Sequence, residues 1–267
     1  MMAEHSPVRG PLTGLRVLVT RPEGQAASLT HLLTQDGAIP VEVPLISIRP
    51  CDDAHGVIQR TLESLPDYHW LVFTSVNGVQ VFFHRLSRLG LTPEALHKHS
   101  IAAIGPATAQ SLRDHGIDVD LVPAEHSTAG MVQAMQRFDL QAKRILLPRA
   151  SEGSPNLPPS LEAFGAQVDD LSLYRTEIRQ DAATRLLEGF RRGLDAATFT
   201  SPSTVRAMVT VLAGHVELLT PVVLACIGPV TANAARQAGL AVHVVASEYT
   251  VTGLVQALRE HYSHGRT

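Results

Sequence analysis

An internal repeat constrains the fold of this chain more than any other feature of its sequence. The segment Ala102–Met135 aligns without a gap with Ala225–Leu258, and 15 of the 34 aligned positions are identical. Two shorter pairs follow the same order in both halves: Trp70–Gly78 with Ala196–Thr204, and Arg16–Gly24 with Arg144–Gly153. Repeats of this length are typical of duplicated domains, because solenoid units have periods of about 20 to 50 residues.

Each copy has the pattern of a parallel α/β sheet. Short apolar segments such as Arg16–Thr20, Leu71–Phe73 and Ile101–Ile104 alternate with segments whose apolar residues recur at helical spacing. A further strand is expected at Asp118–Val122, before a helix capped by Ser127 or Thr128. Short buried strands alternating with helices indicate parallel sheets. The sequence therefore predicts two doubly wound α/β domains with a cleft between them.

Two extended segments break the alternation of strand and helix. Val41–Pro50 and Asp169–Ile178 occupy related places in the two halves, and each leads away from a strand. We expect them to connect the domains. The pattern leaves open whether the two domains follow one another along the chain or interleave.

Composition limits the partners of the protein. At roughly 150 residues per domain, the 267 residues fit two domains, and 22 basic against 25 acidic side chains give a net charge of −3. No run of Lys or Arg is long enough to follow a phosphate backbone, which argues against nucleic-acid binding. The uncharged segment Leu218–Ala235 is broken by Pro221 and by Gly228-Pro229, which argues against a membrane span. With no signal peptide visible at the N-terminus, we expect a soluble, cytoplasmic protein.

Common catalytic and cofactor motifs are absent from the sequence. It contains no glycine-rich nucleotide-binding motif, no nucleophile elbow and no zinc-protease motif. The two cysteines, Cys51 and Cys226, are too few for a disulfide framework or a thiolate zinc site. We therefore expect neither a metal nor a cofactor.

Small hydroxyl residues gather where the predicted strands end and the helices begin. Ligands of open α/β sheets bind at this edge, where helix N-termini present backbone N–H groups to anions. An ordinary helix-capping role is the alternative for each serine and threonine. For the two arginines the alternative is a position on the surface or a hydrogen bond to a backbone carbonyl. The predicted substrate-binding residues are Thr20, Arg21, Thr74, Ser75, Asn77, Thr108, Arg149, Thr200, Ser201, Ser203 and Thr231.

An ordered set of segments resembles the uroporphyrinogen-III synthase family, over about residues 14–260. Members of that family diverge widely, so the complete set carries more weight than any single motif. The matching segments are VLVTRPEGQA at Val17–Ala26, FTSVNG at Phe73–Gly78, IGPATA at Ile104–Ala109, LYRTE at Leu173–Glu177, FTSPST at Phe199–Thr204 and IGPVTA at Ile227–Ala232.

The resemblance implies a particular domain organisation. The first domain would be discontinuous, combining residues 1–44 with 176–267, and the second would comprise residues 49–171. A two-stranded connector, residues 45–48 and 172–175, would join them. The chain carries no methyltransferase half, so it resembles the stand-alone form.

The resemblance also implies a reaction, the cyclisation of linear hydroxymethylbilane to uroporphyrinogen III with loss of water and inversion of ring D. The eight carboxylates of that substrate suit turns rich in backbone donors. Tyr174 matches the family's tyrosine and would act as an acid near the departing hydroxyl, because a phenol with a pKa near 10 stays protonated at neutral pH. The alternative for Tyr174 is a packing role between the domains.

A monomer that acts on a small molecule is expected, with transient contact to the preceding pathway enzyme left open. The alternative from a different functional class is a non-catalytic two-lobed module that binds or senses a small polyanion. The lack of a signal peptide argues against a periplasmic binding protein, and the lack of a helix-turn-helix segment argues against a repressor.

Overall fold

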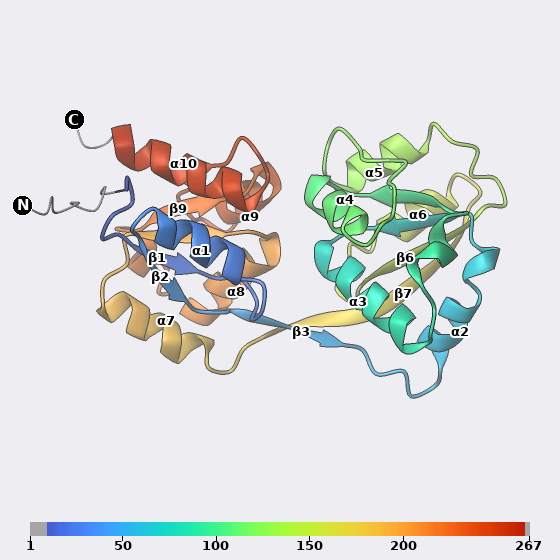
Figure 1. The fold of residues 1–267 in the computed structure, drawn as a ribbon, viewed down its shortest axis with the longest axis horizontal. Helices are drawn as coiled ribbons and strands as arrows, with labels where there is room; N and C mark the ends of the chain where they lie inside the picture. The colour runs from blue at the N-terminus through green and yellow to red at the C-terminus, as the bar shows by residue number, and fades with distance from the viewer. Residues whose placement is uncertain (1–9, 265–267) are drawn as a thin grey trace, which may run out of the picture. The chain divides into compact units, whose positions relative to one another are not determined.

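The computed structural model describes residues 10–264, which form two compact α/β units (Figure 1). One unit combines the chain up to Ser47 with the chain from Glu177 onward, and the other comprises Ile48–Thr176. Each unit contains a sheet of five strands flanked by helices, which confirms the predicted α/β class. Within residues 10–264, no helix is both long enough and apolar enough to cross a membrane.

The discontinuous unit has the strand order β10-β9-β8-β1-β2, and all four neighbouring pairs are parallel. Its elements are β1 (Arg16–Val19), α1 (Ala27–Gln35), β2 (Ile39–Glu42), α7 (Ala182–Arg191), β8 (Ala196–Phe199), α8 (Pro202–Leu212), η3 (Val216–Leu219), β9 (Val223–Cys226), α9 (Pro229–Gln237), β10 (Val244–Val245) and α10 (Val251–His264).

The continuous unit has the strand order β3-β7-β6-β4-β5, in which β5, β4, β6 and β7 are parallel. Its elements are β3 (Ile46–Pro50), α2 (Val57–Glu63), η1 (Leu65–Asp67), β4 (Trp70–Phe73), α3 (Val76–Arg88), η2 (Pro93–Leu96), β5 (Ser100–Ala103), α4 (Pro106–Arg113), α5 (Thr128–Met135), β6 (Arg144–Ala150), α6 (Leu157–Glu162) and β7 (Gln167–Ile178).

Two strands, β3 and β7, carry the chain from one unit into the other. The amide of Cys51 donates to the carbonyl of Leu173, and the amide of Arg179 donates to the carbonyl of Leu45. Residue numbers rise along one strand as they fall along the other, which is an antiparallel pairing. Of the two segments that break the strand–helix alternation, Val41–Pro50 contains β3, and Asp169–Ile178 is contained in β7.

The two copies of the sequence repeat exchange strands when they form the sheets. The first copy contains β1, β4 and β5, and the second contains β6, β8 and β9. Yet β1 pairs with β8 of the other copy, and β6 pairs with β4. Each sheet therefore combines the opening strand of one copy with the later strands of the other, so the units interleave along the chain.

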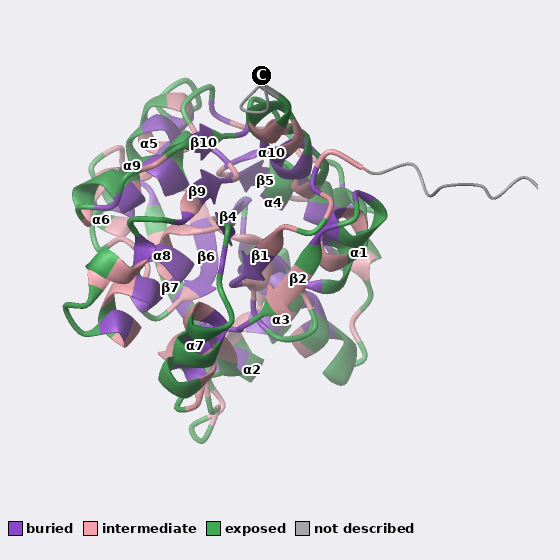
Figure 2. Cartoon of the chain, turned by 90° about the vertical axis from the view of Figure 1, so that its left-hand side faces the viewer, coloured by how far each residue is buried: buried purple, intermediate pink, exposed green. Residues whose placement is uncertain are grey.

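Both faces of each sheet are buried, as parallel sheets require. In β4, Leu71 and Phe73 belong to a core cluster that includes Phe82 of α3. The alternate residues Trp70 and Val72 belong to a second cluster that includes residues of α5 and α6. Figure 2 shows inner strands such as β1, β6 and β9 as buried, and the outward surfaces of the helices as exposed. Helices on both faces therefore leave only the sheet edges and strand ends for function.

The prediction of a strand at Asp118–Val122 is wrong. The structure has only an isolated bridge there, between Ala102 and Leu121. The side chain of Asp120 accepts a hydrogen bond of 2.7 Å from the amide of Ile101, a donor that a neighbouring strand would use. The other repeat copy has the same arrangement, in which Nδ1 of His243 accepts from the amide of Leu224 and the following β10 has only two residues. A side-chain acceptor thus shortens the outer strand in both units.

Candidate functional site

The predicted residues gather at one edge of each sheet. Because β1, β8, β9 and β10 are parallel, their carboxyl ends meet at the same edge of the discontinuous unit, and the ends of β4, β5 and β6 meet likewise in the continuous unit. The first edge carries Thr20, Arg21, Thr200, Ser201, Ser203 and Thr231. The second carries Thr74, Ser75, Asn77, Thr108 and Arg149.

Serine hydroxyls cap the helices that follow β4 and β8. Ser75 Oγ accepts from the amide of Gly78 at 3.0 Å, and Ser201 Oγ accepts from the amide of Thr204 at 3.3 Å. Ser201 Oγ also lies 2.8 Å from Ser203 Oγ. The capping alternative therefore holds for both serines. Both are only half-buried, as are Thr74 and Thr200, so a capping role does not remove them from contact with a ligand.

Glycine begins the next helix in both units. Gly105 and Gly228 are the N-cap residues of α4 and α9, and neither helix has a side-chain hydrogen bond at its cap. The first helical residues, Pro106 and Pro229, carry no N–H, so the backbone N–H groups that can meet an anion are those of the next residues in the first turn. A Cβ at Gly228 would lie 3.0 Å from the ring of Tyr249, and one at Gly105 would lie 3.4 Å from the side chain of His126.

Close packing fixes the loops that carry these two rings. A Cβ added to Gly130 in α5 would overlap the carbonyl oxygen of Glu125, and one added to Gly253 in α10 would overlap the carbonyl oxygen of Glu248. Ser127 Oγ and Thr250 Oγ1 accept from the amides of Gly130 and Gly253, each at 3.0 Å. The sequence predicted a cap at Ser127 or Thr128, and the structure shows that it is Ser127. The cap at Thr250 and the need for glycine became visible only in the packing.

Thr108 and Thr231 occupy matching positions in the first turns of α4 and α9. They are 4% and 3% exposed. Their side chains are therefore buried beneath the turns that begin the two helices. The backbone around them, rather than an extended side chain, is what each turn offers to a ligand.

Tyr174 lies in β7 and is 3% exposed. Its hydroxyl lies 2.8 Å from Ser75 Oγ, and its ring belongs to the same core cluster as Leu173 and Phe73. Burial raises the pKa of Tyr174, as does the charge of Glu152, whereas the hydrogen bond with Ser75 acts in the opposite direction. The phenol is therefore protonated throughout the neutral range, and its contact with the sheet edge is through Ser75.

Two predicted binding residues are fully engaged by the protein itself. Thr20 is completely buried, and its hydroxyl donates to the carbonyl of Thr198 at 2.7 Å. Arg149 is 4% exposed and forms a two-pronged ion pair with Asp170, with Nε and one terminal nitrogen each 2.6 Å from a carboxylate oxygen. Its other terminal nitrogen donates to the carbonyl of Ser154. We therefore leave Thr20 and Arg149 out of the proposed ligand contacts.

Arg21 differs from Arg149 in its surroundings. Its side chain is partly exposed, but its Nε is buried with no hydrogen-bond acceptor among the described residues. Burial lowers the pKa of the guanidinium group. Arg21 is thus a partly buried cation that lacks an ion pair like the one between Arg149 and Asp170.

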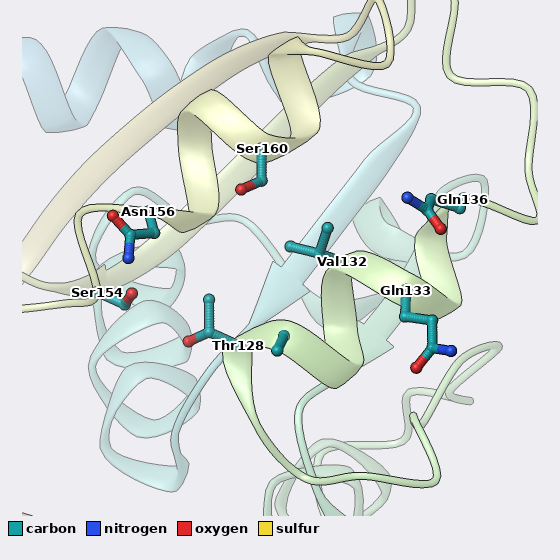
Figure 3. A pocket seen from close by; sticks show the side chains of 8 residues that line it. Thr128, Val132, Gln133, Gln136, Ser154, Asn156 and Ser160 are labelled. Atoms are coloured by element: carbon teal, nitrogen blue, oxygen red, sulfur yellow. The ribbon is translucent and has the colours of Figure 1, made fainter.

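A groove between α5 and α6 was not predicted. It encloses about 420 Å³ and is lined by neutral residues, among them Thr128, Gln133, Asn156 and Ser160 (Figure 3). Figure 3 shows side chains from both helices turned toward this groove. No motif marks such residues in a sequence, because the groove depends on the packing of two helices that are separated along the chain.

Comparison with known proteins gives a consistent result. The family model described as uroporphyrinogen-III synthase HemD matches residues 27–256. A porphyrin biosynthesis protein HemD from Ruminiclostridium josui is 30% identical over 259 residues, which cover 95% of this chain. The chain spans only 50% of the length of that relative. A uroporphyrinogen-III synthase from Chlorobaculum parvum is 29% identical, over 91% of this chain and 98% of the relative.

Solved structures show the same fold. A crystal structure of a mutant uroporphyrinogen III synthase from Thermus thermophilus superposes with a TM-score of 0.69, over 94% of this chain and 100% of that one. The sequence identity of this pair is 21%. At that level the likeness supports the architecture of two α/β units and says nothing about individual side chains.

Proposed function

The chain belongs to the uroporphyrinogen-III synthase family, and we propose that it catalyses the cyclisation of hydroxymethylbilane to uroporphyrinogen III. The match of the family model to residues 27–256 is the observation that carries this proposal. The reaction is a lyase step, in which the hydroxymethyl group loses its oxygen as water. Nothing in the structure or in the comparisons favours the alternative of a non-catalytic binding module.

The isomer that forms depends mainly on the conformation in which the protein holds the substrate. Electron-rich pyrroles expel the hydroxyl themselves, and the terminal ring then attacks the resulting azafulvene. Its substituted carbon has no proton to lose, so after that attack the bond from this carbon to the adjacent bridging carbon must break and re-form at the free carbon of the same ring, which then loses its proton. The protein must hold a flexible tetrapyrrole so that attack occurs at the substituted carbon, which inverts ring D. Groups that fix the carboxylates of the substrate are therefore more important than a strong acid or base.

The strand ends provide such groups. The N-termini of α4 and α9, which follow the N-cap residues Gly105 and Gly228 and have no side-chain cap, present backbone donors to carboxylates. We propose that hydroxyl and amide side chains beside them complete the ligand contacts, with Thr108 and Thr231 shaping the turns beneath. These flanking residues are Thr74, Ser75, Asn77, Thr200, Ser201 and Ser203.

We propose that Tyr174 acts through Ser75. A serine hydroxyl has one donor and two acceptor positions. Ser75 Oγ already accepts from the amide of Gly78, and a second bond from the hydroxyl of Tyr174 would fill its acceptor positions. The Ser75 proton would then point outward, where it can donate to the departing hydroxyl. Tyr174 is in this proposal a positioning residue with a protonated phenol.

The setting of this activity is also a proposal. We propose a cytoplasmic monomer that uses no metal or organic cofactor, consistent with the lack of cofactor motifs in the sequence. Transient contact with the enzyme that makes hydroxymethylbilane would shorten the time in which this unstable substrate closes by itself.

An isomer assay tests the proposed function. Freshly generated hydroxymethylbilane is incubated with the protein, the products are oxidised, and the type I and type III isomers are separated. We expect type III uroporphyrin to dominate, whereas the uncatalysed reaction gives type I. If only type I forms at every protein concentration, the proposed function is wrong and a binding module becomes the better explanation.

A further inference from the structure

Comparison of the two repeated units isolates one unbalanced charge. In the discontinuous unit, Arg21 follows β1, and in the continuous unit Arg149 follows β6. The two strands correspond, because RVLVTR at residues 16–21 aligns with RILLPR at residues 144–149. Each strand is followed by one helix and then by a parallel neighbour, β2 or β7. The same arginine therefore occurs twice in the same local fold.

In the continuous unit the neighbouring strand neutralises the arginine. Asp170 of β7 lies opposite Leu147, two residues before Arg149. Its carboxylate receives both prongs of the guanidinium group at 2.6 Å. A planar guanidinium and a carboxylate match in this geometry, which explains why Arg149 tolerates nearly complete burial.

In the discontinuous unit the equivalent carboxylate points elsewhere. Glu42 of β2 lies opposite Val19, two residues before Arg21, which is the register position of Asp170. Its Oε1 accepts instead from the hydroxyl of Thr30 at 2.6 Å. Within residues 10–264, no carboxylate forms an ion pair with Arg21, and its Nε is buried without an acceptor.

We infer that Arg21 binds a carboxylate of the substrate, which takes the place that Asp170 occupies beside Arg149. This inference rests on the proposed function and names one specificity contact within it. The partial exposure of Arg21 leaves its guanidinium group reachable from solvent, and its place after β1 puts it at the edge where the ligand contacts gather. A substrate whose carboxylates are esterified would lose this contact.

The structure predicts opposite behaviour for the two arginines. In Arg21→Gln the fold loses a partly buried cation without a partner, so the melting temperature should stay the same or rise. In Arg149→Gln the carboxylate of Asp170 loses its partner, so the melting temperature should fall. Arg191→Gln is a control for net charge, because Arg191 is exposed in the last turn of α7, and it should change neither stability nor kinetics.

Steady-state kinetics with hydroxymethylbilane measure the contact itself. A charge-assisted bond predicts that Arg21→Gln raises KM about 10- to 100-fold, with a smaller effect on kcat. Arg21→Lys keeps the positive charge but loses the planar group that can bind a carboxylate through two hydrogen bonds. Its KM should therefore lie between that of the wild type and that of Arg21→Gln. An unchanged KM in Arg21→Gln would overturn the inference, as would a loss of stability equal to that of Arg149→Gln.

A binding assay separates this inference from the proposed function. Uroporphyrin III carries the same eight carboxylates and is chemically stable, so its effect on the melting temperature can be measured without turnover. We expect it to raise the melting temperature of the wild type and of Arg191→Gln, with most of the shift lost in Arg21→Gln. No shift in the wild type, or an equal shift in Arg21→Gln, contradicts the inference whichever isomer the enzyme makes.

Discussion

The hydrogen bond between Tyr174 and Ser75 allows the proposed positioning role to be tested by a double-mutant cycle. Tyr174→Phe removes only the hydroxyl that lies 2.8 Å from Ser75 Oγ and keeps the ring in its core cluster. No cavity forms, and Ser75 keeps the amide of Gly78 as a partner. The stability loss should therefore be about 1 kcal/mol, which corresponds to about 2–4 °C in Tm for a protein of this size.

Ser75→Ala should cost more stability than Tyr174→Phe. It removes the N-cap of α3, worth about 1 kcal/mol, and leaves the buried hydroxyl of Tyr174 unpaired, worth about 1–3 kcal/mol. In the double variant the unpaired hydroxyl is gone as well. The double variant should therefore be about 1–3 kcal/mol more stable than the sum of the two single losses predicts. Urea unfolding of the four proteins measures all three differences.

The kinetic arm of the cycle tests function. If Tyr174 orients Ser75, Tyr174→Phe should slow formation of the type III isomer by roughly 10²-fold, or about 2.7 kcal/mol of barrier. Ser75→Ala should slow it at least as much, and the double variant should be no slower than Ser75→Ala, because the two residues act in series. Additive kinetic losses would refute the proposal that Tyr174 acts through Ser75. Unchanged turnover in Tyr174→Phe would leave that tyrosine only a packing role.

Three further predictions concern stability and reactivity. Gly130→Ala and Gly253→Ala should each lower stability by about 1–3 kcal/mol or more, and an unchanged thermal unfolding curve would show that the loop behind that glycine can move. Cys226 is buried, and burial raises its pKa to about 11. At pH 8 a thiol reagent should therefore label Cys226 only when the protein unfolds. Labelling as fast as that of an exposed thiol would contradict its burial. Burial, helped by the charge of Asp195, raises the pKa of Tyr262 to about 12. The stability that this raised pKa contributes is fully present below about pH 10 and is lost as the pH rises to 12. Tyr262→Phe should therefore flatten the fall of the urea midpoint between pH 10 and pH 12, and a fall as steep as in the wild type would contradict this.

Much of the local structure could be predicted because its causes act over a few residues. Val79, Phe82 and Leu86 recur at helical spacing, and all three are buried in α3. Ser75 and Ser201 precede their helices as caps, as any serine in that position favours. The strand at Asp118–Val122 could not be excluded from its pattern, because the reason lies in one carboxylate that reaches back across 19 residues to Ile101.

The sequence by itself determined that the chain holds two copies of one α/β architecture, with hydroxyl-rich turns where the strands end. Apolar periodicity, caps and glycines are local signals, and they occur twice. Only the tertiary structure decided that β1 joins β8 of the other copy, and that Asp170 meets Arg149 while Glu42 turns away from Arg21. Both outcomes depend on which strands become neighbours and in which direction a side chain turns, and residues far apart in the chain settle those questions through packing. Two arginines at corresponding positions of the repeat thus lie in different surroundings.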